Sequence, residues 1–193
     1  SADLFKNSLF AISASGTTHP GAIQLASDLA GMLGARAFFT DPHESDGLIA
    51  LTDLLPKLSA AALLQAVTRQ PGWREARKLG GHAFFAATEA VNQFDGLKEP
   101  GAAALLDAEN AVRVLDNLIA ELTSLRELVR NQDADELNKA LSGAVEARQQ
   151  WWRDRQKSNW EGLPEAPSIP SRREIWGRYI GLGRRKDKSS DKK

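Results

Sequence analysis

His43 and its neighbours are the first candidates for chemistry in this chain of 193 residues, which contains no cysteine. A helix would place His43 and Asp46 on adjacent turns, at the spacing that metal ligands use. A metal site needs a further ligand, and no partner motif is visible. A helix start explains the same residues, because Asp41 is a good N-cap, Pro42 suits the first turn and Glu44 lies near the positive end of the dipole. We therefore expect a solvated helix start and no metal site.

His19 lies with Pro20 in a turn rich in threonine and glycine, directly before an apolar segment that suits a helix. A lone histidine titrates near neutral pH and is a tempting catalytic group. A helix start is the simpler interpretation, with Thr17 or Thr18 as the N-cap.

His82 follows two glycines, Gly80 and Gly81, beside a helical segment. Adjacent glycines indicate close approach of a backbone, which leaves two alternatives open. His82 either faces a ligand or lies where two helices pack.

Motifs for cofactors and nucleophiles are missing from the sequence: it contains neither GxGxxG nor GxxxxGK[ST], and no GxSxG. We therefore expect no catalytic residue and no cofactor bound by this chain alone. Trp151 and Trp152, with nearby arginines, could stack on nucleic-acid bases. The preferred interpretation places one tryptophan in the core and the other in an interface.

The formal net charge of zero hides an asymmetry along the chain. Residues 172–193 carry nine Lys/Arg against three Asp/Glu, a net charge of +6, so residues 1–171 carry −6. An acidic body is a poor nucleic-acid binder, because that affinity depends on neutralising phosphates. The apolar runs also look too short for a membrane span, and no signal peptide is visible. We expect a cytoplasmic protein that binds neither nucleic acid nor membrane.

Apolar periodicity predicts a strand over 7–14, a helix over 19–33 closed by Gly34, and a strand over 35–40. Such a strand–helix–strand unit is typical of an α/β layer, but two strands are too few for a stable sheet. It is interpreted as the end of a larger α/β domain.

The rest of the chain predicts consecutive helices without strands, which is typical of a helical bundle. The expected helices cover 41–69 with a kink at Pro56, 73–94, 102–130, and a last helix after an Asp133-x-x-Glu136 capping box that extends to 158. The fold class is therefore mainly α. The expected domains are an α/β remnant at 1–41, a helical domain at 42–160, and a C-terminal part at 161–193. That last part would hold an extended arm, an amphipathic segment (REIWGRYIGL) and a basic, disordered tail.

The order of these elements resembles the C-terminal portion of the prephenate/arogenate dehydrogenase family of tyrosine biosynthesis. The resemblance rests on LGARAFFTDPHESD, the proline-interrupted helix, GGHAFFAATEAV and the later AELTSLRELVRNQDADELNKALSGAVEARQQW. It covers about residues 4–160. It implies the end of a nucleotide-binding domain followed by an all-helical dimerisation domain.

Carried over onto this sequence, the family's substrate-site positions are changed. The resemblance aligns a histidine before Leu-Pro with Leu54, and a second polar position with Lys57. Its substrate-binding arginines align with Phe85 and Glu89, whereas Thr88 is retained. A glutamate in place of a guanidinium disfavours a substrate with two carboxylates. The substrate-cleft candidates are Leu54, Lys57, His82, Phe85, Thr88 and Glu89.

Two functions follow from the resemblance. The chain is either the dimerisation and substrate-cleft portion of a dehydrogenase, or a divergent non-catalytic homologue that serves assembly or regulation. In the first case a full-length parent would use NAD or NADP to oxidise and decarboxylate prephenate or arogenate, and this piece alone would not catalyse. In both cases the broad apolar stripes predict a homodimer through the helices at 102–158.

Overall fold

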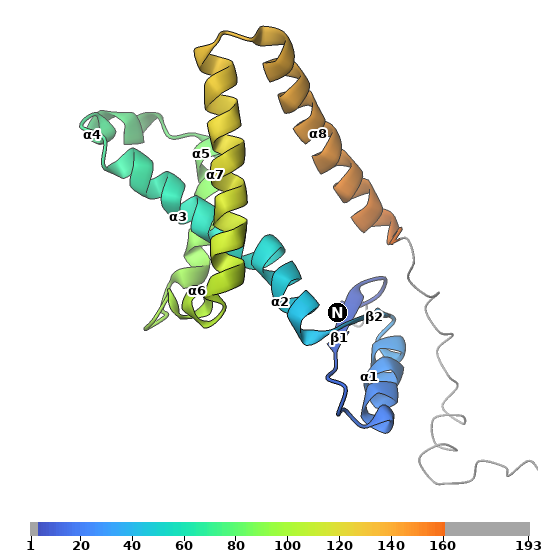
Figure 1. Cartoon of the computed structure of the whole chain (residues 1–193). Coiled ribbons are helices and arrows are strands. Elements are labelled where there is room, and N and C mark those ends of the chain that lie inside the picture. Colours follow the sequence, from blue (N-terminus) through green and yellow to red (C-terminus); the bar gives the residue numbers. More distant parts are fainter. Residues whose placement is uncertain (1–3, 161–193) are drawn as a thin grey trace, which may run out of the picture. The chain divides into compact units, whose positions relative to one another are not determined.

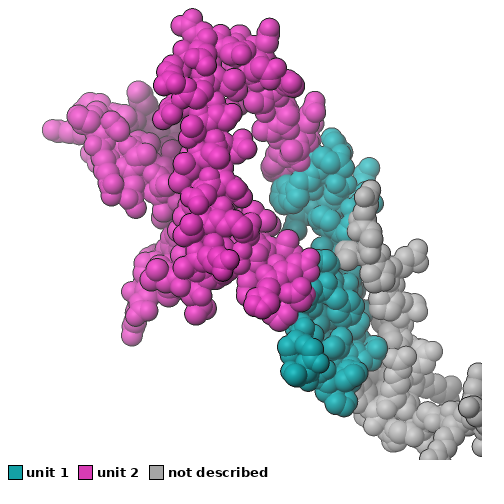
Figure 2. Space-filling view, in the orientation of Figure 1, with its two compact units in different colours: residues 1–40, 150–193 teal, residues 41–149 magenta. Residues whose placement is uncertain are grey.

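The structure, a computed structural model, describes residues 4–160 as mainly α-helical with one two-stranded parallel sheet, and so confirms the predicted fold class (Figure 1). The chain divides into two compact units, unit 1 (residues 1–40 and 150–193) and unit 2 (residues 41–149), coloured separately in Figure 2. The predicted arm, amphipathic segment and basic tail lie outside the described residues. The elements, in chain order, are β1 (Leu9–Ser13), α1 (Pro20–Met32), β2 (Arg36–Thr40), α2 (Pro42–Ile49), η1 (Ala50–Leu54), α3 (Leu55–Thr68), α4 (Trp73–Ala76), η2 (Arg77–Leu79), α5 (His82–Thr88), η3 (Glu89–Phe94), α6 (Ala102–Leu106), α7 (Ala108–Arg130) and α8 (Ala134–Lys157).

Unit 1 contains the predicted strand–helix–strand motif. The strands β1 and β2 pair in parallel, with Leu9 opposite Arg36 and Ser13 opposite Thr40, and α1 connects them. A parallel pair needs such a crossover because a tight turn cannot join strands that run the same way. Ile12 and Ala37 are buried in the small core that the strands and α1 enclose.

Both ends of α1 are capped, but the N-cap differs from the prediction. His19 itself is the N-cap, because its Nδ1 accepts a hydrogen bond from the Gly21 amide at 3.0 Å. Thr17 and Thr18, the expected caps, bond instead to Ser15. A histidine reaches the cap position because its Nδ1 can accept from the amide two residues ahead, as an Asn or Asp oxygen does.

The helix α1 ends at Met32, and Gly34 closes it, as predicted. Gly34 has φ of 76°, in the left-handed region that glycine adopts without steric cost. The Ala35 amide donates to the Ala30 carbonyl at 2.9 Å and the Gly34 amide to the Gly31 carbonyl at 3.1 Å. This pair of bonds forms a Schellman motif and turns the chain directly into β2.

In unit 2, α2, η1 and α3 form one helical run that passes through Pro56. Asp41 caps its start by accepting from the Glu44 amide at 3.0 Å, with Pro42 in the first turn, which confirms the predicted helix start. The predicted interruption near Pro56 takes the form of a π turn, in which the Leu55 amide donates to the Ala50 carbonyl five residues back. A proline lacks an amide proton and crowds the carbonyl four residues earlier, and a wider turn relieves that crowding.

The run Pro42–Thr68 is also long and apolar enough, by length and composition alone, to cross a membrane. The expectation that no segment of the chain reaches that length was therefore wrong. In unit 2 this run packs against α5, η3 and α7, and it contributes the buried residues Ala50, Leu54 and Ala60. Only 17% of the most apolar 18-residue window of this run is buried, so most of it is exposed in the single chain.

Two predicted helices are broken in the structure. The segment 73–94 is divided into α4, η2, α5 and η3, with Gly80 and Gly81 between helical pieces. Both glycines have extended ψ values, 109° for Gly80 and −163° for Gly81, which stop a helix. The segment 102–130 is divided at Asp107 into α6 and α7. The apolar residues keep a helical spacing across both breaks, because the segments on either side are themselves helical. The sequence pattern therefore did not reveal the breaks.

The long helices α7 and α8 expose much of their apolar surface. Figure 1 shows α7 crossing α3, and on this side Ala111 and Val114 are buried. A second apolar stripe is more than half exposed at Val112, Ile119, Leu122 and Val129. Their spacing of three to seven residues places these four side chains along one face of α7.

The helix α8 has no buried residue, although Leu141 and Val145 also lie one turn apart. Trp151 is 49% exposed and Trp152 44% exposed, so the prediction that one tryptophan lies in the core was wrong. Their rings instead contact each other, with centroids 5.8 Å apart. Two adjacent side chains of an α-helix can both be exposed to solvent where no other element packs on that part of the helix.

Candidate functional site

A cavity of about 420 Å³ lies in unit 2, where the α2–η1–α3 run faces the segment that joins η3 to α7. We call it the unit 2 groove. Apolar side chains form most of its wall, and five charged side chains belong to its lining. The lining residues are Asp46, Ile49, Ala50, Asp53, Leu54, Lys57, Gln93, Phe94, Leu97, Glu99, Pro100, Ala102, Ala103, Leu106 and Asp107.

The helical run gives the groove one regular wall. Asp46, Ala50, Asp53 and Lys57 recur at steps of three and four residues, so they project from one face of the run. The π turn at η1 lies within this wall and ends at Leu54. Single π turns often occur at functional sites, because the extra residue changes the direction of the side chains that follow.

Leu54, one of the substrate-cleft candidates, is 8% exposed and belongs to the core as well as to the groove wall. A leucine offers a ligand dispersion contact and no hydrogen bond. Whatever binds here therefore meets a hydrocarbon surface at this position.

Lys57, the second candidate on this run, is held by Asp53. Its Nζ lies 2.6 Å from Asp53 Oδ2, four residues earlier on the same helical face. The lysine side chain is 18% exposed, whereas that of Asp53 is 55% exposed. Since the ammonium is already paired with a carboxylate, it offers an anionic ligand less attraction than a free lysine would.

The four other candidates lie on or beside α5 and are not part of the groove lining. Thr88 donates its hydroxyl proton to the backbone, with Oγ1 2.8 Å from the Phe84 carbonyl oxygen. Phe85 is 62% exposed, and His82 is exposed at the helix start. The groove lining therefore includes Leu54 and Lys57 but none of His82, Phe85, Thr88 and Glu89, although α5 and η3 both contact α3.

The predicted close approach at the glycines before His82 is not found. A Cβ atom added at Gly81 would have no neighbour within 4 Å, and one at Gly80 would meet ordinary contacts at 3.4 and 3.5 Å. The glycines serve the helix break instead, because they adopt backbone angles that end one helical piece before the next begins.

His43 lies exposed in the first turn of α2, next to the capping residue Asp41. Within residues 4–160, the structure contains no group of three His, Asp or Glu side chains arranged to hold a metal ion.

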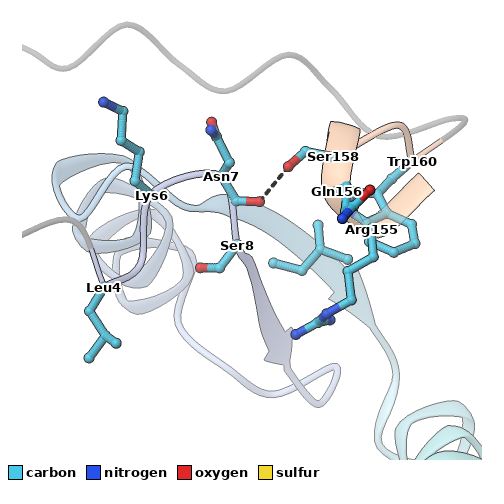
Figure 3. Close-up of a pocket in the computed structure, with 9 residues that line it drawn as sticks. Leu4, Lys6, Asn7, Ser8, Arg155, Gln156, Ser158 and Trp160 are labelled. Atoms are coloured by element: carbon cyan, nitrogen blue, oxygen red, sulfur yellow. Dashed lines mark hydrogen bonds between the residues drawn. The ribbon is translucent and has the colours of Figure 1, made fainter. Parts of the chain in front are cut away.

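A second cavity, of about 440 Å³, lies in unit 1 where the end of α8 contacts β1 (Figure 3). The Ser158 hydroxyl donates to the Asn7 carbonyl at 2.7 Å, and Arg36 Nη1 donates to the Ser158 carbonyl at 3.0 Å. Lys6, Arg155 and Trp160 line the space beside these bonds. These two hydrogen bonds join residues 151 and 122 positions apart, so they fix the end of α8 within unit 1.

Sequence reasoning missed the half of the unit 2 groove that lies between η3 and α7. The sequence predicted Phe94 at the end of a helix over 73–94, Leu97 between two helices and Leu106 inside a helix over 102–130. The available signal was the pair of turn motifs Phe94-Asp-Gly and Glu99-Pro-Gly, which predicted a loop but not where it packs.

Comparison with known proteins finds one matching family model and several solved structures of similar fold. The model of the prephenate dehydrogenase dimerization domain matches residues 41–143. Among solved structures, the Synechocystis arogenate dehydrogenase is similar with a TM-score of 0.68 and 22% identity, over 77% of this chain and 54% of that one. The Aquifex aeolicus prephenate dehydrogenase in complex with hydroxyphenyl propionate and NAD+ matches with a TM-score of 0.68 and 18% identity, over 77% and 51%.

A putative prephenate dehydrogenase from Corynebacterium glutamicum matches with a TM-score of 0.62 and 19% identity, over 78% of this chain and 48% of that one. The chain thus spans about half the length of these solved relatives. No curated protein matches it.

Proposed function

Because the chain belongs to the prephenate dehydrogenase family, with the dimerization domain matched over residues 41–143, we propose that it is the C-terminal portion of a dehydrogenase of this family. In that role, residues 1–41 end a nucleotide-binding domain, residues 42–160 form the dimerisation domain, and residues 161–193 form a C-terminal extension. The helical domain would join two copies and supply one wall of the substrate cleft.

The exposed apolar stripe of α7 is the observation that carries this proposal. Val112, Ile119, Leu122 and Val129 are each more than half exposed in the single chain. A contiguous apolar face of this kind is typical of a surface that another protein covers. A second copy of the same helix would cover it most simply, because most oligomers are symmetric and pair identical surfaces.

The catalytic part of the proposal concerns a full-length parent. There, a nucleotide-binding domain would hold NAD or NADP, the cofactor would accept a hydride from prephenate or arogenate, and the product would lose carbon dioxide. The residues of this chain would bind and orient the substrate rather than transfer a proton. Leu54 would contact apolar atoms of the substrate from the wall of the unit 2 groove.

Turnover by the full-length parent tests the catalytic proposal. The parent would be assayed with prephenate and with arogenate, each with NAD+ and NADP+, while nicotinamide absorbance is recorded. NAD(P)+ reduction with one of these substrates is the expected result. No reduction with any of the four pairs, by a folded parent that binds nicotinamide, would contradict it.

A non-catalytic role is the second candidate, and the burial of Leu54 favours it. At this position the resemblance places a histidine, whereas this chain has a leucine that belongs to the core. Phe85 and Glu89 also replace the arginines that the resemblance implies. A parent that dimerises but reduces neither nucleotide would fit a homologue retained for assembly or regulation.

A further inference from the structure

The start of α1 is capped by a side chain that titrates, whereas Asp41 and Asp133 cap the starts of α2 and α8. His19 Nδ1 accepts a hydrogen bond from the Gly21 amide at 3.0 Å. A ring nitrogen accepts a hydrogen bond only while it carries no proton, so this bond requires a neutral imidazole with its proton on Nε2. The cap of α1 therefore exists in one protonation state of His19 and not in the other.

The imidazole lies tightly against the first turn of α1. A Cβ atom added at Gly21 would lie 3.1 Å from His19 Nδ1 and 3.3 Å from Cε1, closer than side chains normally approach. A glycine at this position therefore leaves the room that the ring needs. Pro20 has no amide proton, and the amides of Ala22 and Ile23 donate to the His19 carbonyl. The Gly21 amide is thus the donor of this turn that depends on the imidazole.

The hydroxyl side chains that precede His19 do not replace the imidazole. Ser15 and Thr18 bond to each other, because the Ser15 amide donates to Thr18 Oγ1 at 3.1 Å and the Thr18 amide donates to the Ser15 carbonyl at 3.0 Å. Within residues 4–160, the Gly21 amide has no acceptor besides the imidazole. Loss of the imidazole bond therefore leaves this amide to water.

The charged groups around α1 do not favour a proton on His19. The strands β1 and β2 both contact α1, and neither β1 nor the loop after it contains a titratable side chain. Arg36 stands at the amino end of β2, and Asp41, which follows β2, accepts from the Glu44 amide. On α1 itself, Asp28 lies more than two turns beyond His19. A protonated imidazole would also meet the positive end of the helix dipole.

We propose that His19 makes the start of α1 sensitive to pH, so that the loop 14–18 and the first turn of α1 are held at neutral pH and released at acidic pH. The cap stabilises α1 while the imidazole is neutral. Its contribution is present above the range in which histidine titrates, about pH 5 to 8, and is lost as the pH falls through that range. An aspartate stays ionised there, so the starts of α2 and α8 do not share the effect. The pH-sensitive cap belongs to unit 1 alone and does not depend on the proposed function.

Two-dimensional NMR of the full chain between about pH 8 and pH 5 tests the proposal. The amide shift of Gly21 should change together with the ring signals of His19. Hydrogen exchange of the Gly21 amide, corrected for the intrinsic effect of pH, should lose about fivefold to tenfold of its protection. Ala30, which is buried near the other end of α1, is the internal reference and should keep its protection.

Two variants assign the effect to His19. His19→Asn keeps a side chain that accepts from a helix amide but does not titrate, so the protection of Gly21 should be the same at both ends of the pH range. The control, His43→Gln, removes another exposed imidazole, in the first turn of α2, and should leave the pH dependence at Gly21 unchanged. His19 and His43 are both exposed, so both variants are expected to fold.

Three outcomes would overturn the proposal. The first is a Gly21 amide whose shift and protection stay constant while the His19 ring titrates. The second is the same pH-dependent loss of protection in the His19→Asn variant. The third is an equal loss at Ala30, because α1 would then open as a whole rather than at its cap. A loss confined to the first turn and absent from His19→Asn would support the proposal.

Discussion

At the scale of single residues, Leu54 belongs both to the core of unit 2 and to the wall of the unit 2 groove. It is 8% exposed, at the end of the π turn in the central helical run. Its burial means that a substitution here changes the stability of the fold as well as the chemistry of the groove. Effects on binding must therefore be separated from effects on folding.

Replacing Leu54 by alanine should lower the free energy of unfolding by about 2–3 kcal/mol, because it leaves a cavity in the small core of unit 2. Urea denaturation at a fixed protein concentration would measure the loss. Leu51→Ala is the matched control, since Leu51 is 42% exposed on the same helical run and should cost less than about 1 kcal/mol. Equal losses for the two variants would contradict the assignment of Leu54 to the core.

Replacing His19 by alanine should destabilise the start of α1 by about 1 kcal/mol, because the Gly21 amide loses its acceptor. Hydrogen exchange of the Gly21 amide would report this local opening, and it should become severalfold faster. Thr17→Ala is the control, since Thr17 caps no helix amide. Faster exchange at Gly21 in the threonine variant, with none in the histidine variant, would restore the cap that the sequence predicted.

At the scale of elements, α7 has two apolar faces with different roles. Val114 is fully buried where α7 packs on η1 and α3, whereas Val112 is 56% exposed on the opposite side of the helix. The two valines are two residues apart on one helix. They therefore form a matched pair of identical chemistry.

The variant Val114→Ala should lower the free energy of unfolding by about 2 kcal/mol without weakening self-association. Val112→Ala should do the reverse, since it removes a methyl pair from the proposed interface and none from the core. Thermal or urea unfolding and sedimentation of both variants would give the comparison. A dimer weakened only by the Val114 variant would place the interface on the wrong face of α7.

Short capping motifs predicted where helices begin and end better than the sequence predicted whether a helix is unbroken. The sequence predicted three caps correctly, because a cap depends on a few adjacent residues. Gly34 closes α1, Asp41 caps α2, and Asp133 accepts from the Glu136 amide at 3.1 Å. The breaks at Gly80–Gly81 and Asp107 were missed, since apolar periodicity persists across them. The groove itself was not predicted; of its lining, only Leu54 and Lys57 were named, and those two came from the family resemblance. The side of the groove between η3 and α7 depends on where a loop packs, which adjacent residues do not determine.

At the scale of the whole molecule, the exposed apolar surface is the main feature that a single chain leaves unexplained. Besides the stripe of α7, α8 exposes Leu141, Val145 and both tryptophans, Trp151 and Trp152. Large exposed apolar surfaces favour association, because water is released when they are covered. The proposed homodimer accounts for this surface in both α7 and α8.

Charged substitutions on the exposed stripe should separate the copies without unfolding them. Ile119→Asp combined with Leu122→Asp places two carboxylates where the proposed interface is most apolar, and burying them unpaired is unfavourable. We expect a folded monomer with unchanged helix content by circular dichroism. A variant that remains a dimer would move the interface away from this face of α7.

Sedimentation equilibrium of the unmodified chain at micromolar concentration tests the central claim most directly. The chain has a mass of 21.0 kDa, and the account predicts a species of twice that mass. A single species of 21.0 kDa across that concentration range would contradict dimerisation through α7 and α8, and with it the role proposed for this part of the family.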